Sequence, residues 1–389
     1  MTPDPGGNVG QLRRRNTGLV LAVLRRGPAT RTDLARRTGL AKATVGSIIA
    51  DLEANHLVAE TGERTTGRGR PGLAVGLTGT NVVGMGFEVN IDYVTAVALD
   101  VSGSVVGTET VPIASGRDPL DAFAEVAEQH SSRLRSLKKR VVGVSVAVPG
   151  LVDSNGRTVR WTTNLGWNDL DMAAVVREAT GLRRVSVEND ANCAAVAEVN
   201  HGVARGSTNM IYLTGTVGIG AGRIVDGELQ RGVHGFAGEV GHIPLGAPQA
   251  RCSCGRTGCW EASIGVRAML HETGFDPIDA DPIVAAEAVA RRAGTDATVA
   301  HGLEIVGSWL GRGLATIVGM NDPGLVVLGG YFVPLAEWIL PAAEDAFESQ
   351  LSFAQIARPE IRLSSMALRA AAIGAADNAL ADLLAGGDL

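Results

Sequence analysis

The sequence contains no apolar run that approaches the ~20 residues required to span a membrane. Its first residues, MTPDPGGNVGQLRRRN, also lack the apolar core of a secretory signal peptide. Cysteine is scarce, because the chain has only four, and three of these lie between residues 252 and 259. We therefore expect a cytoplasmic protein without a membrane partner, in a reducing compartment where thiolates can be held for a metal.

Length and composition predict a protein of several domains with large cores. The 389 residues correspond to two or three domains of ordinary size, and 45% of them are apolar. Glycine, by contrast, is abundant: the chain has 51, near twice the average of ~7%. Many tight turns and close backbone approaches should follow.

The net charge of −6 hides an asymmetry along the chain. Residues 1–80 carry 12 Lys or Arg against 6 Asp or Glu, which gives this part a net charge of +6 and leaves −12 for the rest. A basic segment is typical of a module that binds a polyanion, although a charge run can also be a solvated face. The choice between these interpretations depends on whether a binding motif is present.

The basic segment contains the pattern of three consecutive helices. Apolar periodicity predicts the first helix over residues 17–24. Thr30 and Asp33 make a capping-box-like start for a second helix, which ends at Gly39. A third helix is predicted over residues 42–52, with four apolar residues at core-facing spacing, Val45, Ile48, Ile49 and Leu52. This order is typical of a helix-turn-helix.

The third helix is the element expected to enter the major groove of DNA. It offers Lys42, Thr44 and Ser47 near its N-terminal end to base edges and phosphates. Position 41, where a Ser or Thr cap is expected, is Ala41, and this omission should cost about 1 kcal/mol of helix stability.

Two predicted strands, residues 57–60 and 73–77, follow the helices and form a wing. The tip of the wing carries three arginines, Arg64, Arg68 and Arg70, the last two within Gly-Arg-Gly-Arg-Pro. Such an extended basic segment is thin enough to lie in a narrow, A/T-rich minor groove. The alternative is a flexible basic linker; the position after a helix-turn-helix favours contact with DNA.

A second motif lies far from the basic segment. His242 and the three clustered cysteines, Cys252, Cys254 and Cys259, supply one imidazole and three thiolates. These four ligands make the closed tetrahedral set of a structural zinc, with no open position for an activated water. A disulfide or free thiols are the alternatives, but Cys252 and Cys254 are too close in sequence to bridge comfortably, and three thiols leave one unpaired.

After about residue 78 the sequence changes to Gly/Val-rich strands. Three strands are predicted at 82–89, 93–100 and 105–111, and a similar meander recurs at 210–231. This internal repeat predicts two similar α/β lobes that face each other across a cleft. Ligands of open α/β sheets collect at the carboxyl ends of strands, and there the sequence places Gly150 and the pair Asn189-Asp190, with Asp190 as the expected cap of the next helix.

The run Gly238-Glu239-x-Gly241-His242, followed by Cys-x-Cys-Gly-x-x-Gly-Cys-x-Glu ending at Glu261, resembles the signature of the ROK family of repressors, open reading frames and sugar kinases. The resemblance covers nearly the whole chain. It implies an α/β fold, an N-terminal winged helix-turn-helix (residues 1–78) followed by a two-lobed actin-like, ribonuclease-H-like sugar-kinase fold. The first lobe is expected at 79–203, joined by a C-terminal helix at 370–389, and the zinc-bearing second lobe at 204–369.

The resemblance also implies roles for individual residues. In ROK sugar kinases the motif similar to Asn189-Asp190 binds sugar hydroxyls, and its Asp takes the proton from the attacking hydroxyl. Short carboxylates and amides suit vicinal hydroxyls. If zinc takes one nitrogen of His242, the other is left to donate to a sugar oxygen. Trp167 or Trp260 is a candidate for stacking on the sugar ring, with a core role as the alternative. The expected sugar-binding set is Gly150, Asn164, Asn189, Asp190, Glu239, His242 and Glu261.

The sequence departs from the ROK kinases at the phosphate site. Those kinases carry an Asp-x-Gly-Gly-Thr-Lys-like turn, whereas the matching stretch here reads Glu88-Val89-Asn90-Ile91-Asp92-Tyr93. Side chains replace the two glycines that admit phosphates, and the cationic group is gone. Neither ATP nor Mg²⁺ is therefore expected. The glycine loop at 215–222 and the strand-to-diglycine turn at 321–330 remain as inherited framework.

These features predict a sugar-responsive transcriptional regulator, a repressor of carbohydrate metabolism. Its partners would be an A/T-rich double-stranded DNA operator, a monosaccharide or sugar phosphate, and further copies of itself in a homodimer or homotetramer. The main alternative is an ATP-dependent hexose kinase with an appended DNA-binding domain. A zinc or thiol sensor is disfavoured, because a closed site of three cysteines and one histidine suits a structural role.

Overall fold

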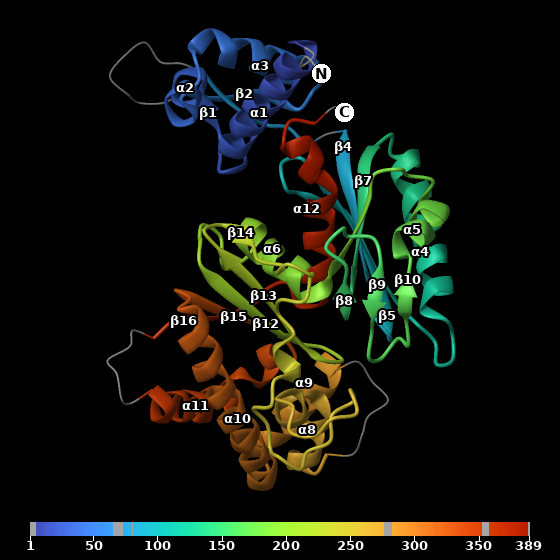
Figure 1. The fold of residues 1–389 in the computed structure, drawn as a ribbon, viewed down its shortest axis with the longest axis vertical. Coiled ribbons are helices and arrows are strands. Elements are labelled where there is room, and N and C mark those ends of the chain that lie inside the picture. Colours follow the sequence, from blue (N-terminus) through green and yellow to red (C-terminus); the bar gives the residue numbers. More distant parts are fainter. Residues whose placement is uncertain (1–4, 65–72, 80, 276–281, 352–357, 388–389) are drawn as a thin grey trace.

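The computed structural model describes residues 5–64, 73–79, 81–275, 282–351 and 358–387. A small N-terminal domain lies at one end of a two-lobed body, and the first and last helices, α1 (Pro5–Arg25) and α12 (Ala370–Leu384), meet at the junction (Figure 1).

The N-terminal domain is a winged helix. Its other elements are β1 (Ala29–Thr30), α2 (Arg31–Thr38), α3 (Lys42–Ala54), β2 (Val58–Arg64) and β3 (Leu73–Leu77), and the strands are ordered β1-β3-β2. The predicted cap is confirmed, since Thr30 Oγ1 accepts from the Asp33 N–H at 3.1 Å. Ala41 gives α3 no side-chain cap, as expected, and the four predicted apolar residues of α3 are all buried.

The first helix is longer than predicted. It begins at Pro5 rather than at residue 17. The extension is anchored by ion pairs from Arg13 to Asp51 of α3 and from Arg14 to Asp382 of α12. These partners lie far away in sequence, so apolar periodicity alone did not reveal the extra turns.

The first lobe contains a five-stranded sheet in the order β11-β7-β4-β5-β6. Helices α4 (Pro119–Ser136) and α5 (Met172–Thr180) belong to the apolar core on one side of this sheet, whereas α12 packs on β4 and β7. A small sheet, β10-β9-β8, stands beside it. The strands are β4 (Val82–Val89), β5 (Tyr93–Asp100), β6 (Val105–Pro112), β7 (Arg140–Val148), β8 (Leu151–Val152), β9 (Val159–Trp161), β10 (Asn168–Leu170) and β11 (Val185–Asn189).

The second lobe repeats this plan with the order β14-β13-β12-β15-β16, which confirms the predicted repeat. Helix α6 (Asp190–His201) packs on β12 and β13. The other elements of the lobe are β12 (Met210–Gly215), β13 (Ile219–Val225), β14 (Glu228–Leu229), the 3-10 turn η1 (Val240–His242), α7 (Glu261–Ile264), α8 (Val266–Thr273), α9 (Pro282–Ala293), α10 (Ala297–Asn321), β15 (Leu325–Gly330), α11 (Phe332–Leu351), β16 (Glu360–Leu363) and the 3-10 turn η2 (Ala367–Arg369).

Helices α6 and α12 pack against each other where the two lobes meet. The packing is close because of a glycine: a Cβ at Gly374 would lie 1.8 Å from the carbonyl oxygen of Cys193. One continuous apolar cluster runs from the winged-helix core through α6 and α12 into the second sheet. The three parts of the molecule therefore share buried surface.

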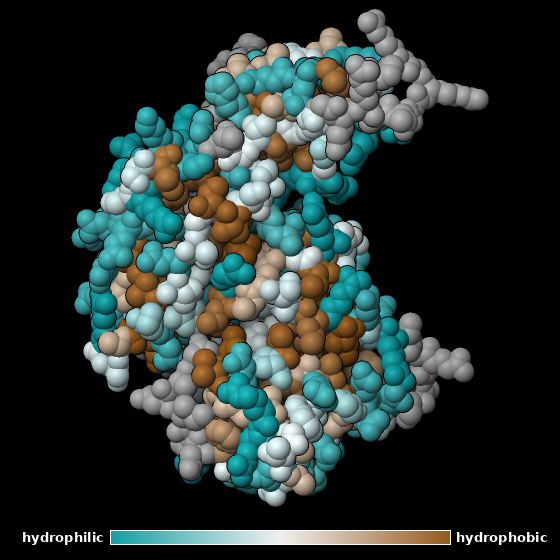
Figure 2. Space-filling model, turned by 180° about the vertical axis from the view of Figure 1, so that it is seen from behind, coloured by the Kyte–Doolittle hydropathy of each residue, from teal (hydrophilic) through white to brown (hydrophobic). Residues whose placement is uncertain are grey.

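Seen from behind, hydrophobic residues gather in a band along the middle of the two-lobed body, and hydrophilic residues border it (Figure 2). Among the described residues, no helix has both the length and the apolar character needed to cross a membrane.

Candidate ligand and metal site

Two neighbouring parallel strands bring the first part of the site together. β7 ends two residues before Gly150, and β11 ends at Asn189, which is paired with Val148 of β7. The Asn189 side-chain amide donates to the carbonyl of Gly150 at 3.1 Å. Gly150 has a φ of +115°, and a Cβ there would lie 2.4 Å from the carbonyl oxygen of Trp161, so a larger residue would strain this loop.

The pair Asn189-Asp190 differs from expectation in one respect. Asn189, not Asp190, caps α6, because its Oδ1 accepts from the Asn192 N–H at 3.0 Å. Asp190 is the first residue of the helix, and its Oδ1 accepts from the Ala191 N–H at 2.8 Å. The sequence did not distinguish them, since Asn and Asp are about equally good caps. Asp190 lines the cavity from the first turn of α6.

All seven predicted sugar-binding residues line one narrow cavity between the lobes. Gly150, Asn164, Asn189 and Asp190 come from the first lobe and the start of α6, whereas Glu239, His242 and Glu261 come from the second lobe. The cavity adjoins a cleft of about 1240 Å³, with Asn164 and Glu261 on the boundary between them.

Two carboxylates of this cavity, Asp190 and Glu239, have pKa values above the ordinary range. Burial raises the pKa of Asp190 to about 6. Burial, and then the negative charges of Asp190 and Glu261, raise the pKa of Glu239 to about 7. A concentration of acidic groups in a half-buried cavity suits a ligand rich in hydroxyl donors.

Glu261 connects the cavity to the cysteine cluster. Its Oε2 accepts from the Ile219 N–H at 3.0 Å, which fixes the glycine loop before β13. Its Oε1 accepts from Ser253 Oγ at 2.9 Å and from Cys252 Sγ at 3.5 Å. Glu261 therefore links the glycine loop, which lines the cavity, to the cysteine loop, which lines the adjoining cleft.

The four predicted metal ligands converge. The ligand atoms of His242, Cys252, Cys254 and Cys259 all lie within 4.8 Å of one another. Cys254 Sγ is 3.7 Å from Cys259 Sγ, too far for a disulfide, and the cysteines are free. His242 turns Nδ1 towards Cys252 Sγ, at 3.6 Å. These residues could hold one metal ion, which would leave Nε2 of His242 for the cavity.

The aromatic residue at the cavity is not one of the two predicted. Trp161 lines the cavity, with its ring centroid 6.3 Å from that of His242. Trp260 is fully buried, and its ring N–H donates to the carbonyl of Trp309, so it has the core role. Trp167 packs against the first-lobe core. One sequence feature could have identified Trp161 as a cavity residue. It ends a short strand, two residues after the buried Val159 and three before Asn164.

The turn that replaces the phosphate loop is filled by its own side chains. Tyr93, 5% exposed, donates its hydroxyl to Oε1 of Glu88 at 2.7 Å. Asn90 Nδ2 donates to the same hydroxyl at 3.3 Å. Glu88, Tyr93 and Asp190 border one small pocket, so this turn and the start of α6 face the same space.

The predicted DNA-contacting residues divide into two groups. Lys42 and Ser47 are exposed on α3, and Thr44 is half-buried on the same helix. Arg64 is the last residue of β2. Arg68 and Arg70 lie outside the described residues.

A winged-helix domain joined to a two-lobed α/β body of the actin-like sugar-kinase type defines the class of protein. The ROK family model matches residues 85–382, and a MarR family model matches residues 13–69. The chain belongs to the ROK family and carries a MarR-type winged helix at its N-terminus.

The similar proteins include both transcriptional regulators and sugar kinases. The xylose repressor of Bacillus spizizenii is 28% identical over 92% of this chain and 92% of its own length. The crystal structure of a ROK family transcriptional regulator, described as a homologue of the E. coli MLC protein, has the same fold over 97% of this chain and 98% of that chain (TM-score 0.80, 24% identity). A ROK glucokinase from Streptomyces griseus, solved with glucose and AMPPNP, is 25% identical and covers 76% of this chain and 99% of its own (TM-score 0.65).

Proposed function

We propose that this protein is a cytoplasmic, sugar-responsive transcriptional regulator that represses genes of carbohydrate metabolism. One observation carries the proposal: all seven residues expected to bind sugar line the interlobe cavity, while Tyr93 and Glu88 are hydrogen-bonded to each other in the turn that matches the phosphate-binding turn of the kinases. The similarity to a xylose repressor over 92% of both chains supports the same conclusion.

The ligand is a monosaccharide or a sugar phosphate held between the lobes. Asn189, Asp190 and Glu239 accept and donate hydrogen bonds to its hydroxyls, and Nε2 of His242 donates to a ring or hydroxyl oxygen. The indole of Trp161 covers one face of the ring. Because these side chains come from both lobes, a bound sugar stabilises one relative position of the lobes over another.

The cysteine cluster holds a structural zinc. A tetrahedral zinc, with Zn–S of about 2.3 Å and Zn–N of about 2.05 Å, requires S···S distances of about 3.8 Å and S···N distances of about 3.6 Å. The distances of 3.7 Å between Cys254 and Cys259 and 3.6 Å between Cys252 and His242 fit these values. An ion held by His242 and the three cysteines would link the loop at 252–259 to η1 and would fix the orientation of the His242 ring.

The DNA partner is a double-stranded operator with A/T-rich minor-groove segments. Lys42, Thr44 and Ser47 contact the major groove, and Arg64, Arg68 and Arg70 contact the adjacent minor groove and phosphates. A homodimer or homotetramer places two such domains on repeated half-sites.

The second candidate is an active ATP-dependent hexose kinase. The raised pKa of Asp190, about 6, favours it, because a base with a pKa near the working pH is suited to take a proton from a sugar hydroxyl. The filled turn at Glu88 and Tyr93 opposes it, since phosphoryl transfer depends on the positioning and neutralisation of phosphates.

A thermal-shift screen of monosaccharides and sugar phosphates, with and without ATP and Mg²⁺, tests the proposal. A ligand of the cavity should raise the melting temperature by mass action, without ATP. The same sugar should change the affinity for operator DNA. If every sugar leaves both the melting temperature and DNA binding unchanged, the proposal is wrong.

A further inference from the structure

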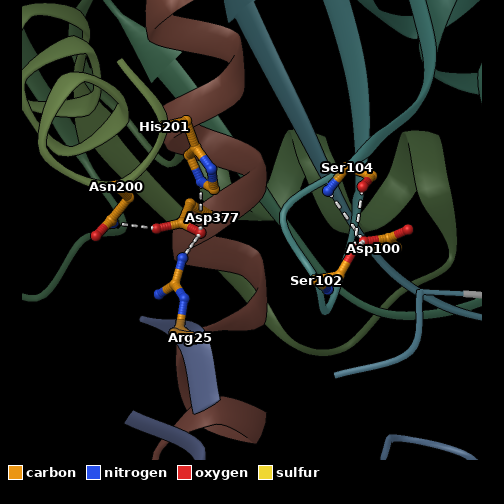
Figure 3. A network of polar contacts seen from close by, with 7 residues as sticks. All are labelled: Arg25, Asp100, Ser102, Ser104, Asn200, His201 and Asp377. Carbon is orange, nitrogen blue, oxygen red and sulfur yellow. Dashed lines mark hydrogen bonds and ion pairs between the residues drawn. The ribbon is translucent and has the colours of Figure 1, made fainter. Parts of the chain in front are cut away.

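A buried carboxylate joins the winged helix to the two lobes. Asp377 of α12 is 4% exposed. It forms an ion pair with Arg25, the last residue of α1, and accepts a hydrogen bond from the side-chain amide of Asn200. Nε2 of His201 lies 3.2 Å from its Oδ1 (Figure 3). One side chain thus contacts both the DNA-binding domain and the end of α6.

Helix α6 reaches from this carboxylate to the ligand cavity. Asn189 and Asp190 stand at its N-terminal end, and Asn200 and His201 are its last two residues. The helix has 12 residues and is therefore about 18 Å long. α6 therefore connects the ligand cavity directly with the residues that contact Asp377.

The helices at this joint belong to different lobes. A Cβ at Gly222 of β13 would lie 2.5 Å from the carbonyl oxygen of Ala191, so α6 is packed tightly on the second sheet. A Cβ at Gly86 of β4 would lie 2.1 Å from the backbone nitrogen of Ala376, so α12 is packed equally tightly on the first sheet. Movement between the lobes therefore acts on the contact between α6 and α12, in which Asn200 and His201 lie beside Asp377.

The chain segment that links the winged helix to the first lobe approaches His201 through the turn between β5 and β6. A Cβ at Gly79, after β3, would lie 1.7 Å from a carboxylate oxygen of Asp100. Asp100 accepts from the backbone N–H groups of Ser102 and Ser104, at 2.9 and 3.0 Å, and so shapes the turn between β5 and β6 (Figure 3). Gly103 in that turn packs on His201, since a Cβ there would lie 2.7 Å from Cε1 of the ring.

We propose that Asp377, with Asn200 and His201, is the joint that transmits occupancy of the sugar cavity to the winged helix. This inference rests on the proposed function, because it concerns how the same cavity regulates DNA binding. When the lobes change position, α6 carries Asn200 and His201 away from their present places beside Asp377. Arg25 pairs with the same carboxylate, so the contact between α1 and α12 changes when Asn200 and His201 move.

The test compares two aspartates of α12. Asp377→Asn removes the charge that holds Arg25 and keeps the shape of the side chain. Asp382→Asn is the matched control, because Asp382 also pairs with α1, through Arg14. In the described part of the chain its other ion pair is with Arg184, which lies outside α6. Xylose and glucose are the first probes. Two quantities are measured for each variant: the sugar-induced melting shift, and the ratio of operator Kd values with and without sugar.

Wild-type protein should show a ratio in the range of about 5- to 150-fold that is usual for coupled sites. Asp377→Asn should still show a melting shift with sugar, while its ratio falls towards one; Asp382→Asn should keep the wild-type ratio. If Asp377→Asn does not fold, Arg25→Gln breaks the same contact from the other side, and Arg25→Lys should restore part of the ratio.

Two outcomes would overturn the joint while leaving the proposed function intact. One is a wild-type ratio of operator Kd values in Asp377→Asn or Arg25→Gln. The other is a loss of this ratio in Asp382→Asn equal to that in Asp377→Asn. Absence of any sugar-induced shift in the wild-type protein, across the full sugar panel, would instead overturn the proposed function and the joint together.

Discussion

The hydroxyl of Tyr93 donates a hydrogen bond of 2.7 Å to Oε1 of Glu88, and both side chains border the pocket that contains Asp190. An aromatic ring in this place, where the matching turn of the kinases has a lysine, hinders the phosphates of a nucleotide and leaves their charge without a cation. We therefore expect no ADP release above background in a coupled assay, with any sugar that raises the melting temperature. Turnover that disappears in Asp190→Asn would show that the protein is a kinase.

Sugar binding should depend on pH through Asp190. Its pKa of about 6 lies above the ordinary value of 3.8, because burial disfavours the charged form. The ionised carboxylate is the better acceptor for hydroxyls, so affinity should be full above pH 6 and should decrease below it, by up to about tenfold per pH unit. Titration calorimetry between pH 5 and 8 measures this slope.

The same group has a pH effect of opposite sign on the ligand-free protein. A raised pKa means that the folded state binds the proton more tightly than the unfolded chain does, so this contribution to stability is lost as pH rises from about 4 to about 6. Asp190→Asn should remove this contribution and should also flatten the pH dependence of sugar binding. An unchanged slope in Asp190→Asn would assign the titration to another residue, such as Glu239, whose pKa is about 7.

Metal content tests the cysteine cluster. Purified protein should contain about one zinc per chain, and Cys254→Ser should lose it together with several degrees of melting temperature, because a serine oxygen is a poor replacement for a thiolate. Cys193→Ala is the control, since Cys193 is buried in α6 and lies outside the cluster. Full zinc occupancy in Cys254→Ser would refute this ligand set.

Salt dependence tests the wing. Replacing Arg68 and Arg70 with Ala should weaken operator binding and lower the slope of log K against log salt by about 0.9 for each lost phosphate contact. Lys42→Ala should also weaken binding, since Lys42 is exposed on α3. Arg291→Ala, on α9 of the second lobe, controls for the loss of one positive charge. An unchanged slope in the double variant would identify the Gly-Arg-Gly-Arg-Pro segment as a linker.

Much of this architecture could be predicted because its signals are local. The capping pair Thr30 and Asp33 and the periodicity of α3 each lie within a few residues. The three cysteines of the cluster lie within one short loop, and His242 is only ten residues before the first of them. The meander that recurs in the two lobes could likewise be recognised from the order of its strands.

The features that sequence reasoning missed depend on distant contacts. The early start of α1 is supported by Asp51 and Asp382, which belong to other elements. Arg25 and Asp377 are 352 positions apart, and neither belongs to a recognisable motif. Trp161 reaches the cavity because a small sheet turns it there, and no spacing rule connects it with His242.

The position of α12 has a consequence for synthesis of the chain. The winged helix and β4 leave the ribosome first, yet the surface on which both pack is supplied by residues 370–384. Until those residues emerge, one face of the first sheet is uncovered and α1 has no α12 to pack against. A nascent chain therefore exposes apolar surface for most of its translation, and chaperone dependence should concentrate in that interval. Because α1 packs on α12, the DNA-binding domain also reaches its final position only after the two-lobed domain has been synthesised.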